Sequence, residues 1–442
     1  MKILRPLILV FLSFLLLIFP INNALAFCGF YVAKADAKLY NQASQVIIAK
    51  DGNRTVLTMA NDYQGAVKDF AMVVPVPVIL KEEQVHIGEP QILERLDEFS
   101  APRLVEYFDA DPCNRPYLED GAFRMPAAPS ASSEMKTGRR NALGVTVEEE
   151  FTVGEYDIVI LSAKESNGLE IWLRNNGYKI PNGASQLLRP YIQQTLKFFV
   201  AKVNLTEYKN TGFKSLRPLM MAYESPKFML PIRLGMLNAN GEQDLIVYLL
   251  SPKGQVELTN YRTVQVPSDV DIPEFVQGEF APFYQAMFKT AYEKNGKKIA
   301  FVEYAWNMAS CDPCSAQPLN PDELRKAGVF WLDSNFSNQV FITRLHVRYA
   351  RPTFPEDLQF QETANNQFFQ GRYVIRHPFK EKRDCDAAQP YYKSVRERQE
   401  TEAKNLAQLT GWNLTEIRKK INFMEGENVP WWRKLWGFLK DN

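Results

Sequence analysis

The segment that decides the fold class is QVIIAKDGNRTVLTM, residues 45–59. Two runs rich in β-branched and apolar residues flank Asp51-Gly52-Asn53, and Asp-Gly is a dipeptide that favours a tight hairpin turn. The segment therefore predicts two antiparallel strands, at 45–49 and 54–59. A second apolar run, at 70–77, lacks polar alternation, which is typical of a strand that is buried on both faces.

The chain from there to residue 349 alternates predicted strands with short helices. The pattern predicts strands at 156–161, 196–203, 245–250, 256–266, 299–305 and 340–349, and helices at 93–99, 168–175, 185–194 and 280–294. Another helix is expected to begin at Pro321, because Asn320 can act as its N-cap and Glu323 completes a capping box. No repeat of fixed period is found, which disfavours a solenoid or a propeller.

The last part of the chain differs from this body. Helical patterns at 391–409 and 414–424 predict that residues 351–442 form a helical C-terminal region. Residues 125–141 are poor in bulky apolar groups and are expected to form a flexible exposed loop. The fold class predicted is therefore α+β: a strand-rich body at 27–350 with several short helices, followed by the helical region.

Composition excludes two broad classes of protein. The chain has 442 residues, of which 46% are hydrophobic, and 52 Lys and Arg balance 51 Asp and Glu. Such a chain is not a disordered polyelectrolyte, and it offers no overall basic field for nucleic acid. Aromatic residues at 12% and 27 prolines are consistent with many strands and turns.

The N-terminus predicts export from the cytoplasm. Lys2 and Arg5 precede the largely apolar run 7–21, and Ala24-Leu25-Ala26 has the small-x-small pattern that signal peptidase cleaves. We expect residues 1–26 to be a signal peptide cut after Ala26. Phe27 stands where a lipobox needs a small residue, so acylation of the following cysteine is not expected. The mature protein is predicted to be periplasmic or secreted.

Five cysteines stand out because an exported chain meets an oxidising compartment. The disulfide candidates are Cys28, Cys113, Cys311, Cys314 and Cys385. Since five is odd, one thiol is left over, and the connectivity stays open. Two interpretations of the Cys-x-x-Cys pair are weighed: a redox pair in a thiol-disulfide oxidoreductase, or structural cysteines bonded to each other or to Cys113 or Cys385.

The surroundings of Cys311 and Cys314 favour the structural interpretation. A redox-active cysteine of the thioredoxin kind lies at a helix N-terminus, whose dipole stabilises the thiolate. Here Pro318 and Pro321 intervene before the predicted helix, and Ser310 replaces the aromatic residue usually found beside the reactive cysteine.

Other catalytic signatures are absent from the sequence. It contains no Gly-x-Ser-x-Gly, Gly-x-x-x-x-Gly-Lys or His-Glu-x-x-His motif. The three histidines, His86, His346 and His377, are scattered, and Glu148-Glu149-Glu150 is interpreted as solvated charge on a strand. No metal site and no cofactor are predicted.

The aromatic tail leaves two interpretations open. Trp431, Trp432, Trp436 and Phe438 alternate with basic residues. Such a segment either lies in a membrane interface or packs its aromatic face onto the body.

A combination of segments identifies a family resemblance. In order and spacing the sequence from Phe27 to Tyr349 is similar to the bacterial domain-of-unknown-function family 2330. The segments that carry the resemblance are 27–33, 61–65, 70–77, 100–107, 111–113, 172–181 and 311–314. The resemblance implies one large domain in an exported or envelope-associated bacterial protein, and it implies no particular activity or substrate.

These observations together favour a non-enzymatic exported protein that binds or scaffolds an envelope partner or ligand, with membrane contact through the tail as an option. One alternative is a periplasmic oxidoreductase that uses Cys311 and Cys314. Another is a hydrolase or processing factor whose site carries no recognisable motif.

Overall fold

The computed structural model describes part of the chain. The described residues are 30–33, 40–41, 44–60, 63–64, 70–113, 145–176, 184–213, 216–237, 241–311, 316–332 and 339–425. The expected signal segment with Ala26, the expected loop 125–141, the aromatic tail, Cys28 and Cys314 lie outside them.

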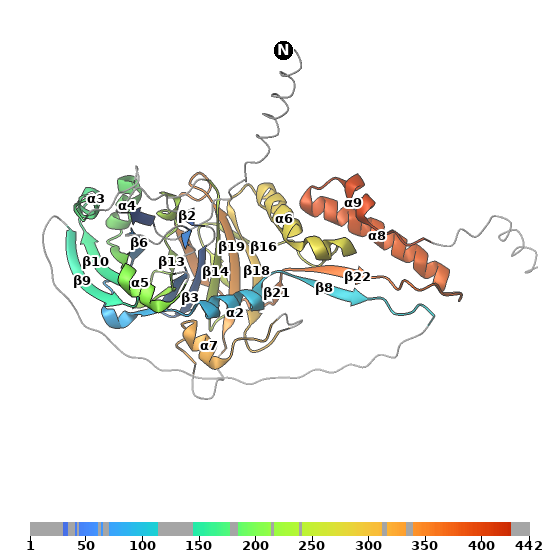
Figure 1. Ribbon diagram of the computed structural model, residues 1–442, viewed down its shortest axis with the longest axis horizontal. Helices are drawn as coiled ribbons and strands as arrows, with labels where there is room; N and C mark the ends of the chain where they lie inside the picture. The colour runs from blue at the N-terminus through green and yellow to red at the C-terminus, as the bar shows by residue number, and fades with distance from the viewer. Residues whose placement is uncertain are drawn as a thin grey trace, which may run out of the picture.

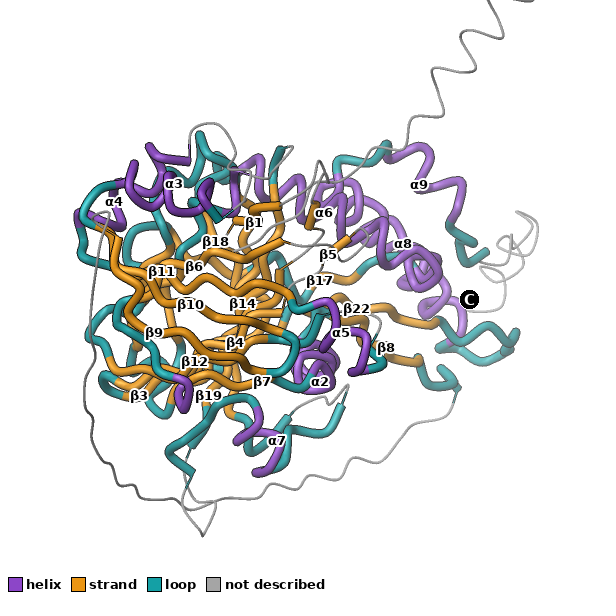
Figure 2. Tube along the Cα trace, turned by 60° about the vertical axis from the view of Figure 1, so that its left-hand side comes forward, coloured by secondary structure: helices purple, strands orange, loops and turns teal. Residues whose placement is uncertain are grey.

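Two β-sheets form the body of the molecule (Figures 1 and 2). One is fully antiparallel, in the order β1 (Phe30–Ala33), β6 (Phe70–Val76), β11 (Lys197–Val203), β10 (Tyr156–Ala163), β9 (Val145–Val153). The larger sheet is mixed, in the order β16 (Arg262–Gln265), β18 (Ile299–Asn307), β19 (Phe341–Tyr349), β14 (Gln243–Ser251), β3 (Ser44–Asp51), β4 (Arg54–Ala60), β12 (Leu219–Glu224), β7 (Val85–Ile87), with β21 (Phe369–Gln370) beside β18.

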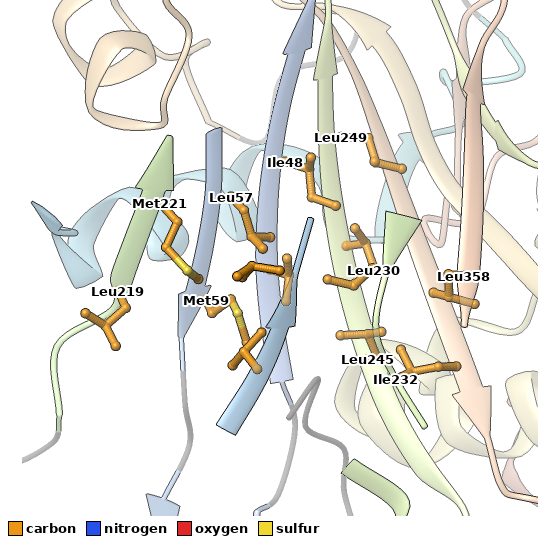
Figure 3. Close-up of a cluster of buried hydrophobic side chains, with 14 of the residues drawn as sticks. Ile48, Leu57, Met59, Leu219, Met221, Leu230, Ile232, Leu245, Leu249 and Leu358 are labelled. Carbon is orange, nitrogen blue, oxygen red and sulfur yellow. The ribbon is translucent and has the colours of Figure 1, made fainter. Parts of the chain in front are cut away.

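The main hydrophobic core fills the space between these sheets. Val46 and Ile48 of β3 point into it, whereas Ile47 and Ala49 point to the opposite face, where another apolar cluster covers them. Figure 3 shows Ile48 and Leu57 beside residues from neighbouring strands. Because strand side chains alternate between faces, a strand that is covered on both sides has a continuous apolar sequence.

Helices cover the outer faces of both sheets. Helices α3 (Ser166–Asn175) and α4 (Ala184–Gln193) pack on the antiparallel sheet. Helices α2 (Pro90–Ser100) and α7 (Pro321–Lys326) pack on the mixed sheet, which α6 (Phe280–Lys294) also covers further along. The smaller strands are β2 (Tyr40–Asn41), β5 (Tyr63–Gln64), β13 (Met229–Leu230), β15 (Val256–Leu258) and β20 (Leu358–Glu362). There is also a short helix, α5 (Leu205–Thr211), and there are three 3-10 helices, η1 (Glu82–Gln84), η2 (Gly235–Leu237) and η3 (Glu274–Glu279), in the described part of the chain.

A second unit projects from one end of this sandwich (Figure 1). Its three strands are all parallel, in the order β17 (Val270–Asp271), β22 (Arg372–His377), β8 (Arg103–Phe108). The helices that complete it are α8 (Ala388–Thr410) and α9 (Leu414–Lys420), and α8 also packs against α6. We call these five elements the distal unit. It combines a strand from early in the chain with the C-terminal segment.

The predicted α+β fold is confirmed, as are the hairpin and the α7 capping box. Gly52 in the hairpin turn has φ +55°, and Asn320 accepts hydrogen bonds from the Asp322 and Glu323 amides. Gly tolerates such a φ because it lacks a Cβ. In the part of the chain that the structure describes, no helix is both long and apolar enough to cross a membrane.

Two secondary-structure predictions are wrong. The single strand expected at 256–266 is divided into β15 and β16, which belong to different sheets. The helical region expected beyond Pro352 begins with strands β20, β21 and β22, and helix starts only at Ala388. In both places the strands are short and pair with distant segments, so long-range pairing outweighs the local pattern.

Candidate functional site

A β-bulge in β18 positions a buried glutamate, Glu303, among other charged side chains. The register of β18 against β19 shifts between Val302 and Tyr304, so Glu303 has no residue opposite it. Tyr304 lies opposite Arg344, and His346 follows two positions further along β19 on the same face. A bulge redirects a side chain in this way, and here it places the Glu303 carboxylate between a guanidinium and an imidazole.

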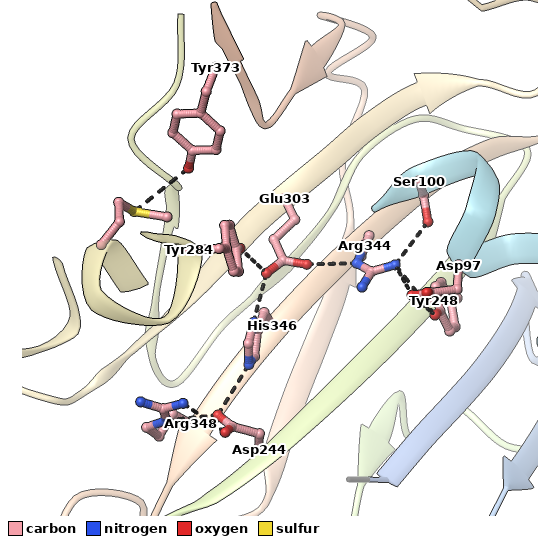
Figure 4. A network of polar contacts seen from close by, with 11 residues as sticks. Asp97, Ser100, Asp244, Tyr248, Tyr284, Glu303, Arg344, His346, Arg348 and Tyr373 are labelled. Atoms are coloured by element: carbon pink, nitrogen blue, oxygen red, sulfur yellow. Dashed lines mark hydrogen bonds and ion pairs between the residues drawn. The ribbon is translucent and has the colours of Figure 1, made fainter. Parts of the chain in front are cut away.

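Both oxygens of the Glu303 carboxylate take part in hydrogen bonds (Figure 4). Arg344 Nε donates to Oε2 at 2.6 Å, and His346 Nδ1 lies 2.7 Å from Oε1. The Tyr284 hydroxyl, from α6, also donates to Oε1. Glu303 is only 1% exposed, so these contacts replace its hydration almost completely.

The contacts continue outward to helix α2 and strand β14. Arg344 Nη1 lies 2.6 Å from Asp97 Oδ1, which also accepts from the Tyr248 hydroxyl at 3.0 Å. On the other side His346 Nε2 lies 3.1 Å from Asp244 Oδ1, and Arg348 binds the same carboxylate at 2.8 and 2.7 Å. We call the connected set the junction network: Asp97, Asp244, Tyr248, Tyr284, Glu303, Arg344, His346 and Arg348.

The charges in the junction network balance when His346 is protonated. Burial alone would raise the pKa of Glu303, but the charges of His346 and Arg344 and the hydrogen bonds hold that pKa at about 2. Burial alone would lower the pKa of His346, but Glu303 and Asp244 raise it to about 9. The three carboxylates therefore face two guanidiniums and an imidazolium at neutral pH.

This arrangement is suited to holding elements together. A general base needs a lone pair that can reach a substrate, yet Glu303 is buried and both of its oxygens are taken by neighbouring side chains. The network instead connects α2, α6 and three strands of the mixed sheet. His346 is also stacked on Phe288 of α6, with 4.0 Å between ring centroids.

The distal unit is braced by a disulfide and by a second charged cluster. Cys113, just after β8, is bonded to Cys385, just before α8. Asp109 binds Arg398 of α8 at 2.8 and 3.2 Å and accepts from the Tyr391 hydroxyl at 2.7 Å. These contacts hold the end of β8 against α8.

The cysteine positions settle some of the open pairings. Because Cys113 and Cys385 are bonded to each other, neither of them pairs with Cys311. Cys311 is itself disulfide-bonded. It does not lie at a helix N-terminus, because α7 begins only at Pro321. Since Cys314 lies outside the described residues, redox activity of the Cys311–Cys314 pair stays a prediction.

The tip of the distal unit exposes two aromatic side chains. Tyr107 is 45% and Phe108 76% exposed at the end of β8. The Phe108 ring is stacked on His377, with 4.4 Å between centroids. His377 lies between two carboxylates, at 2.7 Å from Glu106 and 2.9 Å from Glu274. Burial opposes the charge of His377, but the hydrogen bonds to both carboxylates raise its pKa.

The other residues considered from the sequence lie apart from these clusters. His86 is exposed on β7, and Glu148, Glu149 and Glu150 lie along β9 at the far side of the sandwich. Among the residues that the structure describes, no group of three or more His, Cys, Asp or Glu is arranged to hold a metal ion.

Sequence reasoning missed the junction network, although one signal was present. Arg344, His346 and Arg348 occupy alternate positions of the strand that was predicted at 340–349, among apolar residues. Three polar residues on one face of a buried strand indicate a compensated polar layer. The bulge at Glu303 has no comparable local signal, and the predicted helices that supply Tyr284 and Asp97 gave no sign of where they pack.

Comparison with known proteins gives the family and nothing more specific. Neither the curated proteins nor the solved structures include a match to this chain. A family model described as an uncharacterized protein conserved in bacteria, DUF2330, matches residues 22–361. The match includes the sandwich and β8, and it ends before β21, β22 and the C-terminal helices. The chain therefore belongs to the bacterial family DUF2330.

Proposed function

We propose that this protein is exported to the cell envelope and acts there as a non-enzymatic binding protein whose contact surface is the tip of the distal unit. The observation that carries the proposal is the exposure of two consecutive aromatic residues, Tyr107 and Phe108, one on each face of the end of β8. Large aromatic residues are enriched in protein interfaces, because they bury much apolar area with few rotatable bonds.

The rigid support beneath these side chains favours a binding role. The Cys113–Cys385 disulfide and the Asp109–Arg398 ion pair fix the chain that follows the tip, and pairing with β22 holds the strand before it. Stacking on His377 orients the Phe108 ring. A surface that is already ordered loses less conformational entropy when a partner binds.

Export is supported by the disulfide, and a non-enzymatic role by the junction network. Disulfides persist in oxidising compartments and are rare in the cytosol. Perturbed pKa values often mark active sites, but Glu303 is buried, and both it and His346 are saturated with internal partners. The predicted cleavage after Ala26 fits the same compartment.

A site-specific crosslink tests the contact surface. A photoreactive amino acid at position 108 in the full-length exported protein should give a discrete adduct in the envelope. The matched control is position 171, since Ile171 is also exposed, at 50%, but lies on α3 at the opposite end of the molecule (Figure 1). Equal adducts at both positions, or none at 108, would contradict the proposal.

Fractionation and intact mass test export independently. We expect the protein outside the cytoplasm, with a mature chain that begins at Phe27 and carries no lipid. An unprocessed chain in the cytosol would refute the location.

A further inference from the structure

A cavity lies between the distal unit and η3. It has a volume of about 200 Å³ and lies among η3, the end of β22, α8 and the end of α9. Pockets for drug-sized ligands usually measure about 300–1,000 Å³, so this one suits a smaller molecule. The polar side chains that line it and matter here are Glu274, Arg376, Lys380, Gln399, Glu402 and Lys420.

Glu402 is the unusual member of this lining. It is 3% exposed, and its Oε1 atom has no hydrogen-bond partner in the described part of the chain. Arg398 Nε lies 3.4 Å away as an ion-pair partner, but both terminal nitrogens of Arg398 bind Asp109. A buried carboxylate with a single ion-pair partner at 3.4 Å among the described residues is costly, so its place in the lining of a cavity favours a ligand that donates to the carboxylate.

Most other polar groups of the lining are engaged within the protein. Lys380 binds Glu274 at 3.0 and 3.3 Å. The Gln399 side chain is bonded to main-chain atoms of Asn422 and Met424. Lys420 is likewise bound, at 2.7 and 2.8 Å, to a glutamate of η3.

Arg376 is the cation of the lining that retains donors. Its Nε donates to Asp271 at 3.1 Å, while its terminal nitrogens make no hydrogen bond to the described residues. The guanidinium also lies over the Tyr107 ring. A planar guanidinium with free terminal nitrogens is well suited to a carboxylate.

We propose that this cavity binds a small zwitterion of the α-amino acid type, with its ammonium group on Glu402 and its carboxylate on Arg376. A simple cation would leave the terminal nitrogens of Arg376 without an acceptor, and a simple anion would be repelled by the Glu402 carboxylate. Only a ligand that carries both charges can pair with Arg376 and with Glu402 at the same time. The cavity adjoins the aromatic tip through Arg376, which lies over the Tyr107 ring, but the proposed site rests on Glu402 and Arg376 and does not require the proposed contact surface.

The electrostatics give the binding a pH dependence. Burial raises the pKa of Glu402 to about 7, with Asp271 and Asp109 acting in the same direction and Arg398 and Arg376 opposing them. The carboxylate form accepts the ligand's ammonium protons. Zwitterion binding should therefore strengthen between pH 6 and pH 8.

Calorimetric titration of the full mature protein with alanine tests the proposal. We expect saturable binding that Glu402→Gln weakens by about tenfold or more, because a charge-assisted hydrogen bond is lost. The matched control is Glu397→Gln, at a position that is exposed on the same helix and should bind as the wild type does. Thermal unfolding of both variants establishes that they are folded.

Three analogues isolate the two charges. N-acetylalanine removes the ammonium, alanine amide removes the carboxylate, and ethylamine carries a positive charge alone. All three should bind at least about tenfold more weakly than alanine. The proposal is overturned if alanine does not bind at pH 8, if any analogue binds equally well, or if Glu402→Gln leaves alanine affinity unchanged.

Discussion

Two buried glutamates in this chain meet opposite environments. Glu303, in the sandwich, is 1% exposed and receives hydrogen bonds from an arginine, a histidine and a tyrosine. Glu402, in the distal unit, is 3% exposed, and its Oε1 has no hydrogen-bond partner among the described residues. Their pKa values move apart accordingly, to about 2 for Glu303 and to about 7 for Glu402.

The difference shows that burial alone does not determine what a charged group does. Desolvation raises both carboxyl pKa values, and only the surrounding donors and cations reverse the direction at Glu303. A fully compensated group stabilises the fold. A poorly compensated one, such as Glu402 with Arg398 at 3.4 Å, is held at a cost in stability, and such sites are where proteins often keep function.

The largest effect is expected when the compensation at Glu303 is removed. Glu303→Gln leaves Arg344 and His346 without their shared carboxylate, and breaking a buried ion pair in this way costs about 3–5 kcal/mol of unfolding free energy. Urea unfolding measures the change. Glu94→Gln, an exposed position on α2, should stay within about 0.5 kcal/mol of wild type. Equal effects of both variants would contradict the role of the junction network.

The second-largest loss of stability is expected when the Cys113–Cys385 disulfide is removed. Replacing both Cys113 and Cys385 by Ser removes a link between residues 272 apart in sequence, which typically lowers the free energy of unfolding by about 2–4 kcal/mol. Hydrogen exchange should show the loss mainly in α8, while the strands of the sandwich keep their protection. An equal loss of protection in α8 and in the strands of the sandwich would show that the disulfide does not stabilise the distal unit selectively.

The junction network should also make stability depend on alkaline pH. The folded pKa of His346 is about 9, above its ordinary value of 6.5, so its stabilising contribution is complete below pH 6.5 and is lost as pH rises through 9. Unfolding free energy should fall by about 3 kcal/mol over that window. His346→Gln should abolish this slope and His86→Gln, an exposed position, should retain it. A flat wild-type profile would contradict the charge balance.

The smallest expected effect is a gain in stability, when the Glu402 carboxylate is replaced. The folded pKa of Glu402 lies above its ordinary value of 4.5, so wild-type stability declines as pH rises from 4.5 to 7. Glu402→Gln should therefore increase the unfolding free energy by about 1–3 kcal/mol at pH 8 and change it little at pH 4.5. A lower unfolding free energy of Glu402→Gln at pH 8 would show instead that the contacts of Glu402 within the protein stabilise the fold.

Local sequence patterns predicted much of the sandwich. The Asp51-Gly52 turn, the apolar runs of the strands and the Asn320 cap act within a few residues, and all three are observed. The 256–266 segment was mispredicted because its division into two strands depends on pairing with β20 and β18.

The candidate sites could not be predicted in the same way. Glu303 acquires its partners through a bulge and through helices that are distant in sequence. Glu402 looks like an ordinary charged residue in a helix, and only tertiary packing of η3 and α9 buries it. The Cys113–Cys385 pairing was one of several that five cysteines allow.

The most direct test of the contrast is a titration of the glutamate side-chain carboxyls by NMR, in wild type and in the two single Gln variants. We expect one resonance with a midpoint near pH 7 that is absent from Glu402→Gln. Another should remain ionised down to about pH 2–3 and be absent from Glu303→Gln. If both residues titrate near their ordinary value of 4.5, the two regions treat buried charge alike, and the account is wrong.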